Sequence, residues 1–269
     1  MRRALAMTVL IVLTSCGKAI QQNSQSVNAS PISVADGRFE GKSGEVGLWD
    51  RARGYNCAVF LPASYGQDPN RLYPLILSLH GYNGSVLNIL QTAVGGNRSG
   101  FIKQVWNTPL ATTFDAIVIA PHVYSVGSTE NTLWNRSELR ELILEAKSAF
   151  RVDPARIVVT GNSAGAIATQ ELVKYSHDLL AGAMPGAFQY LYAVNPCEFA
   201  KLPVWAFGND SDGLFDASGW ENLKDVIRAC DGHTQKFKLE VNSNNCGHGC
   251  WDKHWARPEV QRWLVSQTR

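Results

Sequence analysis

The sequence has little excess charge of either sign and few patterns that hold metals or repeat. Of its 269 residues, 25 are basic and 23 are acidic, without a run of like charge. No two cysteines have the C-x-x-C spacing of a zinc site or a redox dithiol. Neither an internal repeat nor a Pro/Gly-rich linker divides the chain after its first few dozen residues. We therefore expect one main domain that needs neither a metal nor an organic cofactor.

The first fifteen residues have the organisation of a removable export signal. Arg2 and Arg3 precede the apolar stretch 4–13, which is too short to span a bilayer. Leu-Thr-Ser-Cys at 13–16 then resembles the lipobox of bacterial lipoproteins, which implies that Cys16 is lipidated and begins the mature chain. An ordinary signal peptide or a buried first strand is the alternative. No later segment approaches the roughly 20 apolar residues of a membrane helix.

Removal of residues 1–15 makes the mature chain formally neutral. The segment carries two arginines and no acid, so 25 minus 2 leaves 23 bases against 23 acids. Nucleic acid or an anionic surface would favour an excess of lysine and arginine, so we expect neither as the main partner. Residues 16–35 are rich in Gln, Asn and Ser and predict a flexible tether. Residues 36–269 would then form a single domain, anchored by lipid at the periplasmic or extracellular face of the bacterial cell envelope.

Five cysteines remain after the lipidated one: Cys57, Cys197, Cys230, Cys246 and Cys250. An exported compartment permits disulfides, and an odd count leaves at least one thiol unpaired unless it pairs between chains. The sequence leaves the connectivity open. The chain is long enough to bury a core without staples, so any bridge would be a local reinforcement.

Short apolar runs rich in β-forming residues alternate with helical patterns along the domain. The expected strands cover residues 56–61, 75–80, 116–120, 156–160, 181–184, 204–208 and 237–241. The expected helices cover residues 138–150, 164–175, 219–229 and 258–266. This alternation predicts an α/β fold with a mostly parallel sheet covered by helices on both faces. Ligands bind such sheets at the carboxyl ends of the strands.

One strand end places a serine between two glycines. The strand 156–160 runs into Gly161-Asn162-Ser163-Ala164-Gly165, and a helical pattern follows at once. Glycines suit a strand that reverses into a helix within a few residues, where side chains have no room. The pattern predicts that Ser163 is a nucleophile held at the sheet edge. A helix-capping serine in a glycine-rich loop is the alternative.

A nucleophilic serine needs a base, and the base needs an acid to orient it. In folds with this turn the acid and then the base follow the serine in the chain. His248 follows the last expected strand in a glycine-flanked loop, which makes it the expected base. The strand 204–208 leads into a turn with Asp210 and Asp212, and either of them can supply the acid.

A carbonyl under attack also needs hydrogen-bond donors for its developing negative charge. The backbone N–H of Ala164 is one candidate and that of Tyr82, after the strand 75–80, is the other. We expect His80 to support the Tyr82 loop rather than to catalyse. Trp134 and Trp251 lie in loops at the same edge; they either pack in the core or bind an aromatic or extended acyl group.

Five segments carry a resemblance to a known fold family: YPLILSLHG at 73–81, VDPARI at 152–157, LPVWAF at 202–207, CGHGCW at 246–251 and RWLVSQ at 262–267. They resemble α/β-hydrolases. Within that fold they are similar to a bacterial group of carboxylesterases, predicted phospholipases or peptidases, and polyhydroxybutyrate-depolymerase-like or feruloyl-esterase-like proteins. In two places the sequence departs from this group: Gly208 replaces a usual histidine and Ala164 a common methionine.

The resemblance implies a serine hydrolase. It places the nucleophile on Ser163, the acid on Asp212 and the base on His248, with oxyanion donors on Tyr82 and Ala164. The expected substrate is a small or polymeric carboxylic ester, such as a feruloyl, acetyl or polyester-type compound. A serine peptidase of the same fold and a non-catalytic binding lipoprotein are the alternatives.

Overall fold

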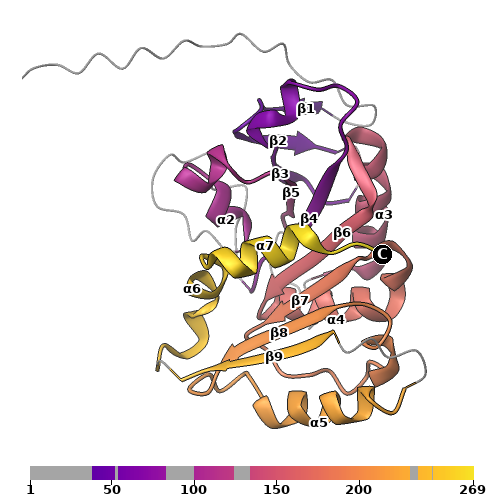
Figure 1. Ribbon diagram of the computed structural model, residues 1–269, viewed down its shortest axis with the longest axis vertical. Helices are drawn as coiled ribbons and strands as arrows, with labels where there is room; N and C mark the ends of the chain where they lie inside the picture. The colour runs from indigo at the N-terminus through magenta and orange to yellow at the C-terminus, as the bar shows by residue number, and fades with distance from the viewer. Residues whose placement is uncertain (1–37, 52–53, 83–99, 124–133, 231–235, 244) are drawn as a thin grey trace, which may run out of the picture.

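The computed structural model describes residues 38–51, 54–82, 100–123, 134–230, 236–243 and 245–269 (Figure 1). Its strands are β1 (Arg38–Glu40), β2 (Val46–Asp50), β3 (Cys57–Phe60), β4 (Tyr73–Leu79), β5 (Ile117–Pro121), β6 (Val152–Asn162), β7 (Gly182–Gly186), β8 (Val204–Asn209) and β9 (Phe237–Asn242). Its α-helices are α2 (Ile102–Val105), α3 (Arg136–Ala149), α4 (Ala164–Ser176), α5 (Ala217–Ile227), α6 (Trp251–Trp255) and α7 (Pro258–Ser266). The lipobox, Cys16 and the tether lie outside the described residues.

The strands form one sheet in the order β1-β2-β3-β5-β4-β6-β7-β8-β9. From β5 through β9 the neighbouring strands pair in parallel, whereas β1, β2, β3 and β5 pair antiparallel at one end. Every expected strand and helix overlaps an observed one, and the predicted α/β fold class with a mostly parallel sheet is confirmed. Because β4, β6 and β8 run in the same direction, their carboxyl ends share one edge of the sheet.

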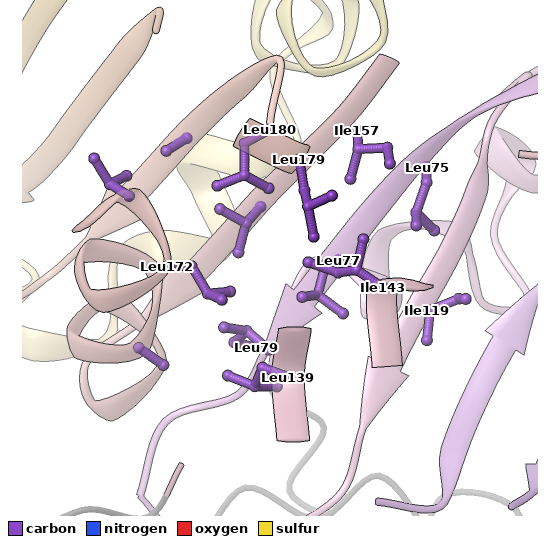
Figure 2. Packing of buried hydrophobic residues seen from close by; sticks show 14 of the residues in the cluster. Leu75, Leu77, Leu79, Ile119, Leu139, Ile143, Ile157, Leu172, Leu179 and Leu180 are labelled. Carbon is purple, nitrogen blue, oxygen red and sulfur yellow. The ribbon is translucent and has the colours of Figure 1, made fainter. Parts of the chain in front are cut away.

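Helices cover both faces of this sheet. On β4, Leu75, Leu77 and Leu79 belong to one apolar cluster with residues of α3, α4 and α5, part of which Figure 2 shows. Ile76 belongs to the cluster on the other face, with residues of α2, α6 and α7. Successive side chains of a strand point to opposite faces, so a strand buried on both sides reads as a continuous apolar run.

The cysteine pairs that the sequence left open are Cys197–Cys230 and Cys246–Cys250. Cys57 is a buried free thiol in β3, and burial raises its pKa. Among the described helices, none is long and apolar enough to cross a membrane.

Candidate active site

Ser163 occupies a strained turn between β6 and α4. Its φ of 54° and ψ of −119° are unusual for a residue other than glycine. The Ser163 N–H donates to the carbonyl of Gly186 on β7 across 3.0 Å, and the Ser163 carbonyl accepts from Ala166 N–H across 2.8 Å. The turn is therefore fixed from the neighbouring strand and from the helix.

The two glycines around Ser163 allow the strand and the helix to approach each other closely. A Cβ atom on Gly161 would lie 2.4 Å from the carbonyl oxygen of Gly165. A Cβ atom on Gly165 would lie 2.2 Å from the carbonyl oxygen of Leu79. Both contacts are with backbone, which cannot swing aside as a side chain can. The G-x-S-x-G pattern is thus a packing requirement of this turn.

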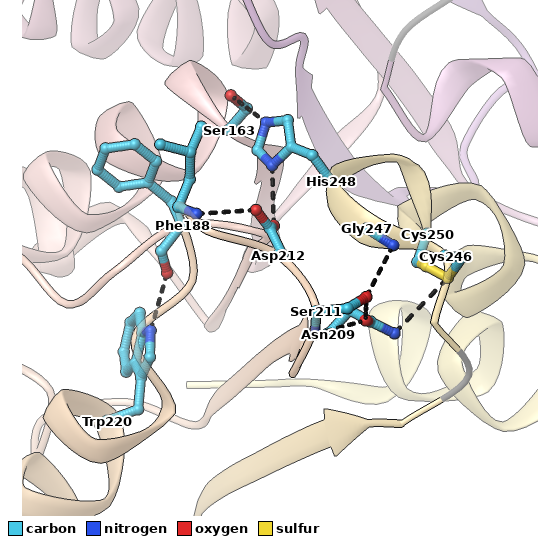
Figure 3. A network of polar contacts seen from close by, with 11 residues as sticks. Ser163, Phe188, Asn209, Ser211, Asp212, Trp220, Cys246, Gly247, His248 and Cys250 are labelled. Atoms are coloured by element: carbon cyan, nitrogen blue, oxygen red, sulfur yellow. Dashed lines mark hydrogen bonds and ion pairs between the residues drawn. A yellow bond between two sulfur atoms is a disulfide. The ribbon is translucent and has the colours of Figure 1, made fainter.

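His248 links Ser163 to Asp212 (Figure 3). The Nε2 atom of His248 lies 2.9 Å from the Ser163 Oγ, and its Nδ1 atom lies 2.8 Å from the Asp212 Oδ2. The carboxylate can only accept, so Nδ1 carries the proton and Nε2 is free to accept the serine proton. The imidazole side chain is 35 % exposed and the Asp212 side chain 1 %. The imidazole is therefore partly open to solvent, and the carboxylate is shielded from it.

The turn after β8 decides which of the two aspartates faces the base. Asp212 N–H donates to the Asn209 carbonyl across 3.0 Å, and the Asp212 Oδ1 accepts the Leu214 N–H across 2.9 Å. Its other oxygen is left to His248. Asp210 is exposed, and its N–H donates to Asn242 on β9. Hydrogen bonds to both carboxylate oxygens compensate the burial of the Asp212 charge.

The two segments that carry the expected backbone donors, Ala164 and Tyr82, both come close to Ser163. Ala164 is the first residue of α4, and N–H groups in the first turn of a helix have no acceptor within the helix. The loop after β4 comes close on the other side, since a Cβ atom on Gly81 would lie 3.2 Å from the Ser163 Cβ. Tyr82 follows in that loop, with a side chain open to solvent. The N–H groups of Ala164 and Tyr82 thus belong to segments that meet at Ser163.

His80 supports the loop of Gly81 and Tyr82 through hydrogen bonds of both ring nitrogens. Its Nδ1 lies 2.7 Å from the carbonyl oxygen of Gly81, and its Nε2 accepts the Val123 N–H across 3.2 Å. One nitrogen donates and the other accepts, which defines a neutral imidazole. Burial lowers the pKa of His80 to about 4, which favours the same neutral form.

The two tryptophans differ. Trp134 is 5 % exposed, and its ring lies 4.7 Å from the ring of His80 and 5.5 Å from that of Tyr55. Of the two roles that the sequence left open for Trp134, this position favours core packing next to His80 over contact with a substrate. Trp251 is half-buried, and its ring meets His248 edge-on at 5.1 Å.

The sequence did not predict the contacts between two loops of the site. We call residues 209–212, which include Asp212, the acid loop, and residues 246–249, which include His248, the base loop. Asn209 and Ser211 reach Cys246 and Gly247 through side-chain hydrogen bonds. The cluster of Asn, Ser and Asp after β8 signals a turn in which side chains bond to backbone, although not which neighbour they reach. Across the described residues, His, Cys, Asp and Glu side chains do not gather in threes as a metal site.

Comparison with solved structures supports the topology. A thermostable esterase aligns with a TM-score of 0.63 at 22% identity over 86% of this chain and 63% of that chain, so this chain spans less than two thirds of that esterase. A feruloyl esterase module from Clostridium thermocellum, complexed with sinapinate, aligns with a TM-score of 0.55 at 16% identity over 89% of this chain and 97% of that one. The chain has the α/β-hydrolase fold.

A fluorophosphonate-binding serine hydrolase of Staphylococcus aureus has a similar structure, with a TM-score of 0.53 at 13% identity over 87% of this chain and 100% of that one. No family model and no curated protein matches the sequence. One fold hosts many activities, so the function has to be argued from the site.

Proposed function

We propose that this α/β-hydrolase-fold chain is a serine hydrolase that cleaves carboxylic esters through an acyl-enzyme. The observation that carries the proposal is the continuous chain of contacts from the Ser163 Oγ through His248 to Asp212, at 2.9 and 2.8 Å. Ser163 also occupies the strained turn between β6 and α4, which is the position of the nucleophile in a serine-hydrolase elbow.

In the first half-reaction, the Ser163 Oγ attacks the ester carbonyl carbon while His248 Nε2 takes its proton. The resulting oxyanion accepts hydrogen bonds from the N–H groups of Ala164 and Tyr82. Asp212 stabilises the positive charge that forms on His248. The tetrahedral intermediate then collapses: the bond to the alcohol oxygen breaks, and His248 returns the proton to the departing alcohol.

In the second half-reaction, water replaces the alcohol. His248 takes a proton from water as the water oxygen attacks the acyl carbon. Collapse of this second intermediate breaks the bond to Ser163, which recovers the proton from His248. The products are one alcohol and one carboxylic acid, and the cycle needs neither a metal nor an organic cofactor.

The proposed substrates are feruloyl, acetyl or polyester-type esters, small or polymeric. Trp251 supports an aromatic acyl group, because it lies beside the base and is half-buried. The feruloyl esterase module among the similar structures is complexed with sinapinate, which is an aromatic acid.

We also propose that lipid on Cys16 anchors the domain at the bacterial cell envelope through the tether 16–35. The support is the lipobox-like sequence after an export-type segment. Mass spectrometry of the protein from a bacterial membrane fraction should find an acylated Cys16 at the new N-terminus. Recovery of unmodified Cys16 in the soluble fraction would refute the anchor.

The alternatives have different requirements. A serine peptidase would use the same three side chains on an amide. A binding protein without activity would need His248 out of reach of Ser163, and the 2.9 Å contact counts against that. Release of nitrophenol from short acyl esters and of aniline from peptide anilides separates esterase from peptidase.

The decisive experiment combines labelling and turnover. A fluorophosphonate should label the protein at Ser163, and Ser163→Ala should lower ester turnover by a factor on the order of 10⁶. Ser137→Ala, at an exposed site on α3, is the matched control and should turn over like the wild type. Ester turnover that survives in Ser163→Ala would overturn the proposal.

A further inference from the structure

The loop that carries His248 receives little support from packing. The base is the middle residue of a three-residue 3-10 turn, Gly247–Gly249. A Cβ atom on Gly247 or on Gly249 would meet no atom of the described structure within 4 Å. Gly247 has a φ of 59°, so its conformation is one that glycine adopts readily. The ring of Trp251 meets the imidazole from one side, and further contacts must hold the loop itself in place.

The acid loop contacts three consecutive residues of the base loop (Figure 3). The Asn209 side-chain amide donates to the Cys246 Sγ across 3.6 Å. The Ser211 Oγ accepts the Gly247 N–H across 3.0 Å. The third contact is the one between Asp212 and His248. The two loops therefore run side by side in a fixed register, and the last contact is the one that the chemistry uses.

Asn209 orients the Ser211 hydroxyl so that its oxygen can accept the Gly247 N–H. The Asn209 Oδ1 accepts both the N–H and the hydroxyl proton of Ser211. The Ser211 Oγ thus turns its lone pairs outward and can accept the Gly247 N–H. Asn209 is itself buried and is the last residue of β8. The hydrogen bonds between the two loops are therefore anchored on the sheet.

The Cys246–Cys250 disulfide closes the other side of the base loop. Cys250 immediately precedes α6, and that helix is anchored in the core by the fully buried Trp255. Asp252 of the same helix forms an ion pair with Lys103 of α2. The disulfide therefore joins the first residue of the loop to an anchored helix, across His248.

We propose that Asn209, Ser211 and the Cys246–Cys250 disulfide act together as a clamp that positions His248 for proton transfer. The inference rests on the proposed esterase function. None of the clamp residues contacts the reacting atoms, so they are positioning residues that act through His248. Their effect should appear in kcat with little change in KM, because a misplaced base impairs the chemical step and leaves substrate binding intact.

The second disulfide provides a matched control. A cross-link restricts the unfolded chain more when it encloses more residues, and Cys197–Cys230 are separated by 33 positions against 4 for Cys246–Cys250. Cys197→Ser with Cys230→Ser should lower the Tm by about 10 °C but change kcat by less than about twofold. Cys246→Ser with Cys250→Ser should lower the Tm by about half as much but reduce kcat by about tenfold or more.

Ser211 offers a second comparison. Ser211→Ala removes the acceptor of the Gly247 N–H and should lower kcat about three- to tenfold. Ser211→Thr keeps the hydroxyl at an exposed position and should restore most of the wild-type kcat. The clamp is refuted if the two double Cys→Ser variants change kcat equally and Ser211→Ala retains the wild-type kcat.

Proton NMR tests the clamp without turnover. The low-field resonance of the His248 Nδ1–H, assigned by its absence in His248→Gln, should be sharp in the wild type. It should broaden in the Cys246→Ser/Cys250→Ser variant and not in the Cys197→Ser/Cys230→Ser variant. If the wild type cleaves no ester and the resonance still broadens as expected, the esterase proposal fails and the clamp stands. An unchanged resonance in both variants overturns the clamp whatever the activity.

Discussion

The indole N–H of Trp255 donates a hydrogen bond to the hydroxyl of Thr160 across 3.1 Å. Thr160 in turn donates to the Met184 carbonyl on β7 across 3.0 Å, and these side chains are buried. The contact joins α6, which follows the loop of His248, to β6, the strand that leads into Ser163. The segments that carry His248 and Ser163 are thus joined by hydrogen bonds inside the core as well as at the site.

Thr160→Val should lower the free energy of unfolding by about 1–3 kcal/mol, because it leaves the buried Trp255 N–H without this acceptor. Valine keeps the shape and the β-branch of threonine, so the decrease in unfolding free energy measures the contribution of the hydroxyl group. Denaturant titration gives this free energy. Thr113→Val, at an exposed site, is the control and should change the unfolding free energy by less than about 0.5 kcal/mol. Equal losses in the two variants would contradict the role of the bond.

Gly165→Ala should both destabilise the protein and impair hydrolysis. The added Cβ would lie 2.2 Å from the backbone oxygen of Leu79, so strand and helix must separate. We expect a loss of about 1–3 kcal/mol in unfolding free energy and about 100-fold in kcat, since Ser163 moves with the turn. Gly213→Ala is the matched control for stability, because its Cβ would meet no described atom within 4 Å. Wild-type stability in Gly165→Ala would contradict the close approach.

The strands of the sheet centre could be predicted because helices cover both of their faces, which leaves continuous apolar runs in the sequence. The edge could not. In β2 (Val46–Asp50) a glycine interrupts the run, because a Cβ on Gly47 would lie 2.0 Å from the backbone oxygen of Glu40. The five residues of α6 (Trp251–Trp255) are too few to show a helical period.

For the candidate site, the chain order was enough to single out Ser163 and His248, which the structure places in contact. The choice between Asp210 and Asp212 depends on how one turn closes, and neighbouring residues of the same type give no signal for that. Trp134 shows the same difficulty, since its burial follows from packing against His80, a residue far away in the sequence. The chemical roles of these residues remain predictions.

His80 predicts a pH dependence of stability. Burial lowers its pKa in the folded state to about 4, below its ordinary value of 6.5. Between these values the unfolded chain binds a proton that the folded chain does not, so stability falls as the pH is lowered. The contribution, up to about 3 kcal/mol, is present above pH 6.5 and lost on acidification toward pH 4.

His80→Gln should therefore flatten the fall in unfolding free energy between pH 6.5 and 4, because glutamine does not titrate. Its amide can donate to Gly81 and accept from Val123 as the imidazole does. Denaturant titrations at several pH values measure the slope, and those at pH 8 give the cost of the substitution itself. An identical slope in the variant and the wild type would refute the prediction.

Trp251 distinguishes two roles for an aromatic ring beside the base. If the ring binds an aromatic acyl group, Trp251→Ala should lower kcat/KM for a feruloyl ester about fivefold more than for an acetyl ester, the loss of one stacking contact. Trp251→Phe should retain most of that preference. If the ring only supports His248, which it meets edge-on at 5.1 Å, both esters should lose kcat equally. An equal loss would therefore remove Trp251 from the substrate site and leave it as a support for the base.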